Sequence, residues 1–296
     1  MNREMLVYID GKYYSKSEAK ISVFDHGFLY GDGVFEGIRA YNGVVFKLKE
    51  HISRLYQSAH AMTLQIPLTK EQMVDAVVET LRKNKLKDAY IRLVVSRGTG
   101  DLGLDPRKCP EPTVVIITGA IVLHGNEAKE KGVTALISWV RRHPVDSTSH
   151  EIKSLNYLNS IMAKIEANNV GMDEAICLDK NGFVSEGTAE NIFIVKNGRI
   201  LTPPAYSGAL SGITAQVVAK IATRLGVDVI ESNITPYQLF NADEVFFTGT
   251  AAEIVPIREV NSRRIGSGKP GPITRQLMEE FQKVIVDPRE GVAIYP

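Results

Sequence analysis

Several features that would indicate other kinds of protein are scarce in this chain. Only two cysteines, Cys109 and Cys177, occur among 296 residues, and they lie far apart. They form neither a metal-ligand spacing nor a disulfide framework, which suits a reducing cytosol. The six histidines show no metal-site pairing, so no metal is expected. The 35 basic and 34 acidic residues nearly cancel, and a net charge of +1 gives no reason to expect nucleic acid as a partner.

Long apolar runs are also missing. The most apolar stretch, 114–123, is too short to cross a bilayer and contains a glycine. The first residues, MNREMLVY, carry an acidic residue and do not resemble a secretory signal. We therefore expect a cytoplasmic protein without a membrane partner. The pairs Arg141-Arg142 and Arg263-Arg264 are too short to be basic tracts, and they are expected on solvated faces or at local anion contacts.

The 44% hydrophobic content is enough for one large domain or two moderate ones. Segment 123–131 is polar and interrupts the apolar pattern. It predicts an interdomain linker between a small N-terminal domain, residues 1–122, and a larger C-terminal domain, residues 132–296.

Strands and helices are expected in mixed order. Asn42-Gly43 predicts a tight hairpin turn within 34–48, and Thr69 with Gln72 forms a capping-box pattern at the start of a helix. Strict βαβ alternation is absent, which favours an α+β fold over a Rossmann fold. Helices are expected at 49–62, 69–84, 153–170, 213–225 and 273–285, single strands at 5–10, 89–96, 112–122, 133–140, 244–248 and 254–260, and hairpins at 34–48, 175–184 and 191–201.

Two segments carry the clearest chemical signal. Lys153 begins the expected helix 153–170, and Tyr157 lies four residues on, on the same face. Glu186 stands in the run EGTAENIF, residues 186–193, directly ahead of an apolar strand. The aldehyde of pyridoxal phosphate (PLP) needs a lysine for a Schiff base, and its ring nitrogen needs a carboxylate. Taken singly, Lys153 and Tyr157 would be surface residues, and Glu186 would decorate a turn.

Three further segments suit a phosphate. Residues 210–214 (LSGIT) precede a helix whose first N–H groups and dipole would face an anion, although Ser211 or Thr214 could simply cap it. The turn 249–252 (GTAA) could offer more N–H donors. Arg54 could supply a fixed positive charge, although by itself it would be a surface residue.

The richest glycine segment is YGDGVFEGIR, residues 30–39. It is neither a P-loop nor a dinucleotide fingerprint, because no Gly-Lys-Ser/Thr follows and it leads into a strand. A backbone that passes close to a ligand between the apolar walls Tyr30 and Phe35 explains the glycines, and a simple glycine-rich hairpin is the alternative.

Together these segments resemble the fold-type IV PLP enzymes of the class IV aminotransferase family, and specifically the branched-chain amino acid aminotransferases. The resemblance covers nearly the whole chain. It rests on residues 186–193, on Ile200-Leu-Thr202, on residues 210–213 and on residues 30–39. One position departs from the family pattern, because Ala215 stands where arginine or lysine is usual. The implied fold is that of D-amino acid aminotransferase, with a small N-terminal α/β domain and a larger C-terminal domain.

The resemblance also implies residue roles. Lys153 would be the catalytic Schiff-base lysine, Glu186 would meet the pyridine nitrogen, and Tyr157 the phenolic oxygen. Arg92 would receive the side-chain carboxylate of glutamate, and the neighbouring subunit of a homodimer or larger homo-oligomer would contribute Tyr30 and Leu104. The implied phosphate ligands are Arg54, Ile213, Thr214 and Thr250, and the implied substrate pocket is lined by Phe35, Gly37, Tyr90, Trp139 and Ala251.

The implied reaction moves the amino group of L-leucine, L-isoleucine or L-valine to 2-oxoglutarate through a ping-pong mechanism, giving a branched 2-oxo acid and L-glutamate. Such a transaminase serves branched-chain amino acid biosynthesis. A D-amino acid aminotransferase and an aminodeoxychorismate lyase share the cofactor chemistry and stay open as alternatives. A PLP-binding or interaction protein without catalysis is a further alternative, against which Lys153, Tyr157 and Glu186 together argue.

Overall fold

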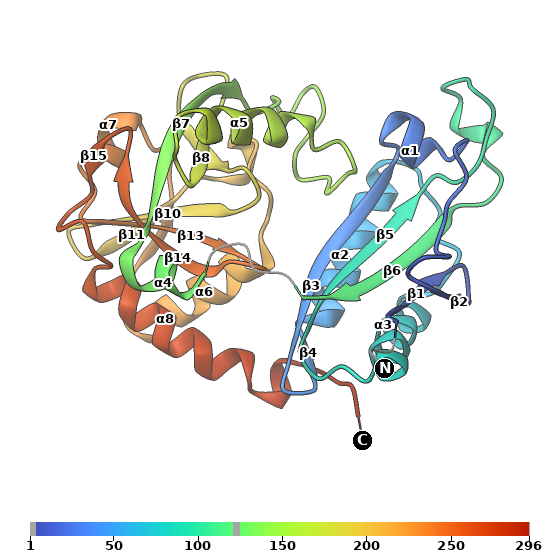
Figure 1. Cartoon of the computed structure of the whole chain (residues 1–296). Helices are drawn as coiled ribbons and strands as arrows, with labels where there is room; N and C mark the ends of the chain where they lie inside the picture. Colours follow the sequence, from blue (N-terminus) through green and yellow to red (C-terminus); the bar gives the residue numbers. More distant parts are fainter. Residues whose placement is uncertain (1–3, 121–124, 296) are drawn as a thin grey trace. The chain divides into compact units, whose positions relative to one another are not determined.

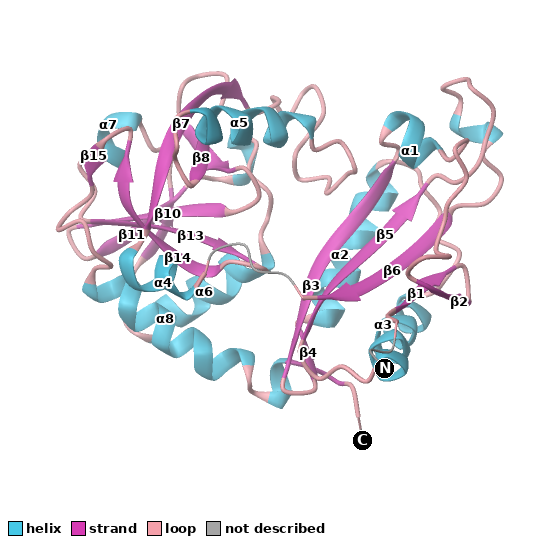
Figure 2. Ribbon diagram, viewed as in Figure 1, coloured by secondary structure: helices cyan, strands magenta, loops and turns pink. Residues whose placement is uncertain are grey.

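The computed structural model of the chain describes residues 4–120 and 125–295. The chain divides into two compact units, drawn in Figures 1 and 2. Unit 1 comprises Met1–Ile121, Ile152–Asn156 and Ile285–Pro296, and unit 2 comprises Val122–Glu151 and Tyr157–Val284. The expected division at 123–131 therefore differs from the observed one in two places, because two short later segments belong to unit 1.

Unit 1 is built on a seven-stranded sheet in the order β16-β4-β3-β5-β6-β1-β2. The central strands β3, β5 and β6 pair antiparallel along most of their length. Aliphatic residues recur at every second position of these strands and so gather on one face, which forms the core. The strands are β1 (Leu6–Ile9), β2 (Lys12–Ser15), β3 (Gly33–Tyr41), β4 (Val44–Phe46), β5 (Ala89–Ser96), β6 (Thr113–Gly119) and β16 (Gly291–Ala293).

Two helices cover one face of this sheet (Figure 2). They are α2 (Leu48–Ala61) and α3 (Lys70–Asn84). Their apolar stripes, with Ile52, Leu55, Val77 and Leu81 at their centre, pack on the strands to form the hydrophobic core of unit 1. The short elements of unit 1 are α1 (His26–Tyr30), η1 (Pro106–Lys108) and η3 (Pro288–Glu290).

Unit 2 is built on a second sheet of nine strands, in the order β12-β11-β10-β13-β14-β7-β8-β9 with β15 beside β14. Antiparallel hairpins and parallel pairs are mixed, as in an α+β fold. The strands are β7 (Val133–Arg141), β8 (Glu174–Leu178), β9 (Val184–Gly187), β10 (Asn191–Lys196), β11 (Arg199–Thr202), β12 (Val229–Glu231), β13 (Glu244–Gly249), β14 (Glu253–Val260) and β15 (Arg263–Arg264).

The helices of unit 2 pack against this sheet. The long ones are α5 (Leu158–Asn169), which lies on β7 and β8, α6 (Ile213–Arg224), which lies on β13, and α8 (Pro272–Ile285), whose last residue belongs to unit 1. Small residues, Ala163 and Ala167, let α5 approach the sheet closely. The short elements are α4 (Asn126–Lys131), η2 (Ala205–Ser207) and α7 (Pro236–Phe240).

Most expected elements are confirmed, including the hairpin at Asn42-Gly43 and the capping box of α3. Part of the expected linker is helical, since α4 begins at Asn126, and residues 121–124 lie outside the described part. The end of the expected strand 112–122 also falls there. The expected helix 153–170 is wrong at its start, because α5 begins only at Leu158 and Lys153 lies in an extended segment.

Candidate active site

Lys153 lies beside the first residues of β3 in unit 1. Its carbonyl accepts a hydrogen bond from the Phe35 N–H at 3.0 Å, and the Leu155 N–H donates to the Gly33 carbonyl at 2.9 Å. The Lys153 N–H donates to the Ser58 hydroxyl of α2 at 3.1 Å. These backbone bonds extend the sheet by a few residues, and they explain why the segment is extended rather than helical.

The Lys153 amine lies over an aromatic ring, with Nζ 4.6 Å from the centroid of Phe35. The guanidinium carbon of Arg92 lies 4.5 Å from the same centroid and 5.5 Å from that of Tyr90. In the register of β3 and β5, Gly37 stands opposite Arg92. A Cβ on Gly37 would come within 2.4 Å of the Tyr90 hydroxyl, so only glycine fits this arrangement. Unit 1 therefore brings together these five expected residues.

Arg54 is held by a buried carboxylate on the helix-covered face of β3. Glu36, which is fully buried, accepts from Arg54 Nε at 2.7 Å and from Nη2 at 2.8 Å, and it bonds His51 Nδ1 at 2.7 Å. Burial raises the pKa of Glu36, but Arg54 and His51 outweigh it and lower the value to about 2. Burial lowers the pKa of His51 against the pull of Glu36. Arg54 is thus no surface residue, because its guanidinium is fixed by a two-point ion pair.

Tyr30 and Leu104 lie on an exposed part of unit 1. The Tyr30 hydroxyl donates to the Leu102 carbonyl at 2.5 Å, and its ring meets the edge of His26, whose Nε2 lies 2.8 Å from the Asp101 carbonyl. These bonds tie α1 to the loop that carries Leu104, which is 78% exposed.

In unit 2, Glu186 is a buried carboxylate with donors on both oxygens. The Leu210 N–H and Asn191 Nδ2 donate to Oε2 at 3.0 and 3.3 Å. Arg142 Nη2 and His150 Nε2 lie 3.3 and 3.5 Å from Oε1. Glu186 is therefore a buried, hydrogen-bonded carboxylate rather than an exposed turn residue, and Arg142 offsets its charge.

The other expected residues of unit 2 lie at ends of its elements. Gly212 caps α6 without a side-chain hydrogen bond, ahead of Ile213 and Thr214, so the alternative of a cap by Ser211 or Thr214 is not realised. A Cβ on Gly212 would come within 1.8 Å of Asn191 Oδ1, the side chain that also donates to Glu186.

Tyr157 is the residue just before α5, and its ring lies edge-on to His150, with the centroids 5.6 Å apart. Thr250 and Ala251 are half-buried in the turn between β13 and β14. Trp139, on β7, is 86% exposed. The described contacts of unit 2 do not bring Trp139 together with Glu186.

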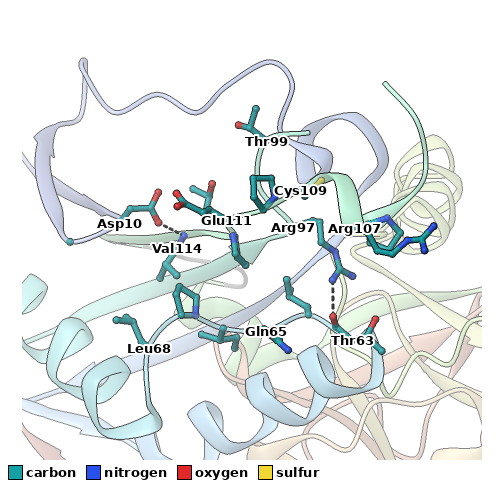
Figure 3. A pocket seen from close by; sticks show the side chains of 18 of the residues that line it. Asp10, Thr63, Gln65, Leu68, Arg97, Thr99, Arg107, Cys109, Glu111 and Val114 are labelled. Atoms are coloured by element: carbon teal, nitrogen blue, oxygen red, sulfur yellow. Dashed lines mark hydrogen bonds between the residues drawn. The ribbon is translucent and has the colours of Figure 1, made fainter. Parts of the chain in front are cut away.

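Unit 1 also contains a hollow of about 1220 Å³ next to Leu64 and Pro112 (Figure 3). Two of its charged groups are engaged within the chain: Asp10 accepts from the Val114 N–H at 2.7 Å, and the buried Arg97 donates to the Thr63 carbonyl at 2.9 Å and to Asp32. None of the sequence-predicted site residues lines it. We therefore do not place the active site there. The described residues also contain no cluster of three or more His, Cys, Asp or Glu side chains arranged to hold a metal.

The side chains present fit pyridoxal phosphate. Unit 1 supplies an amine over an apolar ring and an arginine fixed by a buried glutamate. Unit 2 supplies a buried carboxylate and a helix start capped by glycine alone. Each of these groups matches one part of the cofactor: its aldehyde, its phosphate and its ring nitrogen.

Known proteins agree with this chemistry. Residues 33–260 match the model of the family described as amino-transferase class IV. A Methanocaldococcus jannaschii protein that bears a provisional branched-chain-amino-acid aminotransferase name is 56% identical over 98% of this chain and 99% of its own. The branched-chain-amino-acid aminotransferase of Pseudomonas aeruginosa is 37% identical over 99% of this chain and 96% of its own.

Solved structures give the same result. The branched-chain aminotransferase of Thermoproteus uzoniensis with norvaline matches with a TM-score of 0.93 and 40% identity, over 99% of this chain and all of that one. The Escherichia coli branched-chain amino acid aminotransferase matches with a TM-score of 0.93 and 36% identity, over 97% and 96% of the two chains. The chain belongs to the class IV aminotransferases and has the fold-type IV architecture. It is a PLP-dependent transaminase.

Sequence reasoning missed several residues that the structure places around these groups. Glu36 lies in the glycine-rich segment 30–39 and His51 in the predicted helix 49–62, yet no local pattern identified them as partners of Arg54. Arg142 was expected on a solvated face or at a local anion contact; the solvated face is wrong, because the side chain is 1% exposed, whereas an anion contact is present at Glu186 Oε1, 3.3 Å away. The doublet Arg141-Arg142 resembles a surface pair, and only the burial of Ser138 and Ser160 around it reveals the difference.

Proposed function

We propose that the protein transfers the amino group of L-leucine, L-isoleucine or L-valine to 2-oxoglutarate. The observation that carries this proposal is the cluster around Phe35, where the Lys153 amine and the Arg92 guanidinium lie 4.6 and 4.5 Å from one ring. An apolar surface suits aliphatic side chains, and a guanidinium suits the second carboxylate of glutamate and 2-oxoglutarate. The names of the similar proteins support the same substrates.

When bound, pyridoxal phosphate takes up the amino group and serves as an electron sink. We propose that Lys153 Nζ would hold the cofactor through its aldehyde and, as a free amine, would take the proton from the substrate α-carbon. Arg92 Nη atoms would hold the distal carboxylate during the second half-reaction.

The remaining expected residues complete the proposal. Arg54, oriented by Glu36, would bind the phosphate together with the start of α6 at Ile213 and Thr214 and the turn at Thr250. Glu186 would hold the proton on the ring nitrogen, and Tyr157 would donate to the phenolic oxygen. Phe35, Gly37, Tyr90, Trp139 and Ala251 would line the substrate pocket.

We further propose a homodimer at minimum, with Tyr30 and Leu104 completing the neighbouring subunit's site. The exposed apolar residues Phe28, Leu102 and Leu104 gather around α1 and the loop tied to it by Tyr30, and such surface usually meets a partner. No described helix is long and apolar enough to cross a membrane. Cytoplasmic location is proposed because both cysteines are unpaired and buried.

The test is the visible absorption of the purified, PLP-loaded protein before and after L-leucine is added without any oxo acid. Loss of the PLP band with release of the branched 2-oxo acid is expected, and 2-oxoglutarate should restore the band. Lys153→Ala should lower the rate by about 10³-fold or more, since it removes both the bond to the cofactor and the proton carrier. A wild-type band that responds to D-leucine and not to L-leucine would instead favour a D-amino acid aminotransferase, and a Lys153→Ala variant with full activity would contradict the assignment of that lysine.

A further inference from the structure

Among the residues that the structure describes, Arg142 is one of the largest fully buried side chains. It follows directly after β7, with 1% of its surface exposed. Burying a permanent charge costs several kcal/mol unless the charge is paired, and here both terminal nitrogens have partners while Nε is buried without a hydrogen bond among the described residues. The contacts of Arg142 therefore indicate which role justifies burying its charge.

Both terminal nitrogens of Arg142 are held by the protein frame. Nη1 donates to Asn159 Oδ1 and to Ser160 Oγ, each at 2.9 Å. Nη2 donates to the carbonyls of Gly187 at 2.5 Å and Thr188 at 3.3 Å. Because Asn159 and Ser160 belong to α5 and the carbonyls follow Glu186 in the chain, the guanidinium is fixed between the two elements.

The charge of Arg142 faces Glu186. Its Nη2 lies 3.3 Å from Oε1, while Oε2 is occupied by the Leu210 N–H and Asn191 Nδ2. His150 Nε2 also lies near Oε1, at 3.5 Å. The carboxylate is thus oriented from both oxygens, and arginine is the one partner whose charge does not change over any working pH.

We propose that Arg142 is a positioning residue that holds the Glu186 carboxylate charged and in one orientation, and thereby sets how firmly the ring nitrogen of bound pyridoxal phosphate keeps its proton. This inference rests on the proposed contact between Glu186 and that nitrogen. A buried carboxylate without a cation tends to take up a proton, and a protonated carboxyl could no longer accept a hydrogen bond from a protonated ring. In the proposed arrangement, the permanent charge of Arg142 keeps Glu186 from taking up this proton.

The experiment is a pH titration of the visible absorption of the PLP-loaded protein without substrate, with the dissociation constant of PLP measured alongside. The variant is Arg142→Met, which removes the charge and keeps much of the volume. The matched control is Arg141→Met, because Arg141 is the adjacent arginine and donates only to the Ser138 and Trp139 carbonyls. Each variant is also made in a Glu186→Gln background.

Arg142→Met is expected to lower, by about 0.5–1 pH unit, the midpoint at which the ring nitrogen of bound PLP loses its proton, because a Glu186 without its cation takes up a proton and no longer accepts the hydrogen bond from the ring. It should also weaken PLP binding by about 10-fold or more. Arg141→Met should match the wild type. In the Glu186→Gln background the effect of Arg142→Met should largely vanish, which a merely structural role would not produce.

An unchanged midpoint in a folded Arg142→Met protein would overturn the inference, and so would a shift of equal size in the Glu186→Gln background. If Arg142→Met does not fold, Arg142→Lys is measured instead. It keeps the positive charge, so the midpoint should match the wild type, but it no longer fixes the orientation of Glu186, so PLP should bind more weakly. A wild-type affinity in this variant would overturn the inference. No amino acid is present in these measurements. A wild-type protein that does not convert L-leucine would therefore remove the proposed substrate and leave the role of Arg142 to be decided by the titration.

Discussion

Unit 1 and unit 2 each bury a glutamate against an arginine, and the two pairs are built in opposite ways. In unit 1, Glu36 is fully enclosed and grips Arg54 with both oxygens, at 2.7 and 2.8 Å. In unit 2, Arg142 is the enclosed partner and donates to two carbonyls and two side chains, and its Nη2 lies 3.3 Å from Glu186 Oε1. The enclosed, supporting member of the pair is the glutamate in unit 1 and the arginine in unit 2.

This difference matches the roles proposed for the two pairs. A phosphate requires a fixed cation, so in unit 1 the carboxylate is the support and Arg54 would be the working group. A protonated ring nitrogen requires a fixed anion, so in unit 2 the arginine is the support and Glu186 would be the working group. A buried ion pair contributes little net stability, but it orients its members, and orientation is what a binding site needs.

The largest effect is expected when the support of unit 1 is removed. Glu36→Ala leaves the Arg54 charge buried and uncompensated, which should cost about 3–5 kcal/mol of unfolding free energy. Chemical denaturation of the PLP-free protein measures it. Glu50→Ala, which removes an exposed carboxylate of α2 paired with Lys47, is the control and should cost less than about 1 kcal/mol.

The counterpart in unit 2 is Glu186→Gln. It should cost clearly less than Glu36→Ala, since Arg142 keeps its four other acceptors. Equal losses in the two variants would contradict the opposite construction of the pairs.

Low pH should reduce the unfolding free energy by protonating Glu36, the partner of Arg54. The pKa of Glu36 is lowered to about 2 from an ordinary value of 4.5. A lowered carboxyl value means that the unfolded chain binds the proton more readily, so the stabilisation is present above pH ~4.5 and is lost as the pH falls toward 2. On the order of 3 kcal/mol should disappear in that window.

Thermal unfolding at a series of pH values, with wild type and Glu36→Gln side by side, measures this loss. The variant curve should be flatter between pH 4.5 and 2. A wild-type slope that persists in Glu36→Gln would assign acid sensitivity to other groups.

A smaller effect is expected from replacing the working arginine by lysine. Arg54→Lys keeps the charge and loses the fork that Glu36 holds, so PLP should bind about 10–100-fold more weakly, as for the loss of a charge-assisted hydrogen bond. Equilibrium dialysis or fluorescence quenching measures the affinity. Arg107→Lys, at an 87% exposed side chain bound only to Asp105, should bind PLP like the wild type. An Arg54→Lys protein with unchanged affinity would remove Arg54 from the phosphate site.

The smallest effect concerns the other face of β3, away from Glu36. Gly37→Ala would press against the Tyr90 hydroxyl, 2.4 Å from the new Cβ, and should cost about 1–3 kcal/mol of steric strain. We expect a raised KM for L-leucine with the titration of Glu36 unchanged, measured by steady-state kinetics.

Tyr90→Phe should relieve part of this strain, because the next ring atom lies at 3.1 Å. If the double variant is no better than Gly37→Ala alone, the crowding does not come from the hydroxyl.

The sequence predicted well what depends on near neighbours along the chain. The Asn42-Gly43 turn and the Thr69–Gln72 capping box are closed by groups within four residues, and both formed as expected. The family pattern also predicted the fold and the cofactor, since that pattern is carried by contiguous segments. The cluster of Phe35, Gly37, Tyr90 and Arg92 followed from the resemblance, and the register of β3 and β5 places them side by side.

Local pattern failed where a distant strand decided the conformation. Lys153 has a helical pattern after it, yet it is extended because β3, more than a hundred residues earlier, offers backbone partners that a helix start does not need. The doublet Arg141-Arg142 has the polarity of a surface pair, and its second member is buried because Asn159, Ser160 and two carbonyls converge on it.

What the sequence by itself determined is therefore the class of fold and the cofactor, and it supplied Lys153, Arg54 and Glu186 as the proposed working groups. Only the tertiary structure decided that Glu36 supports Arg54 and that Arg142 supports Glu186. The physical reason is the same for both pairs: residue type and spacing reveal a group's chemistry, but the partner that fixes its charge and direction comes from another part of the chain, and only burial makes that partner necessary.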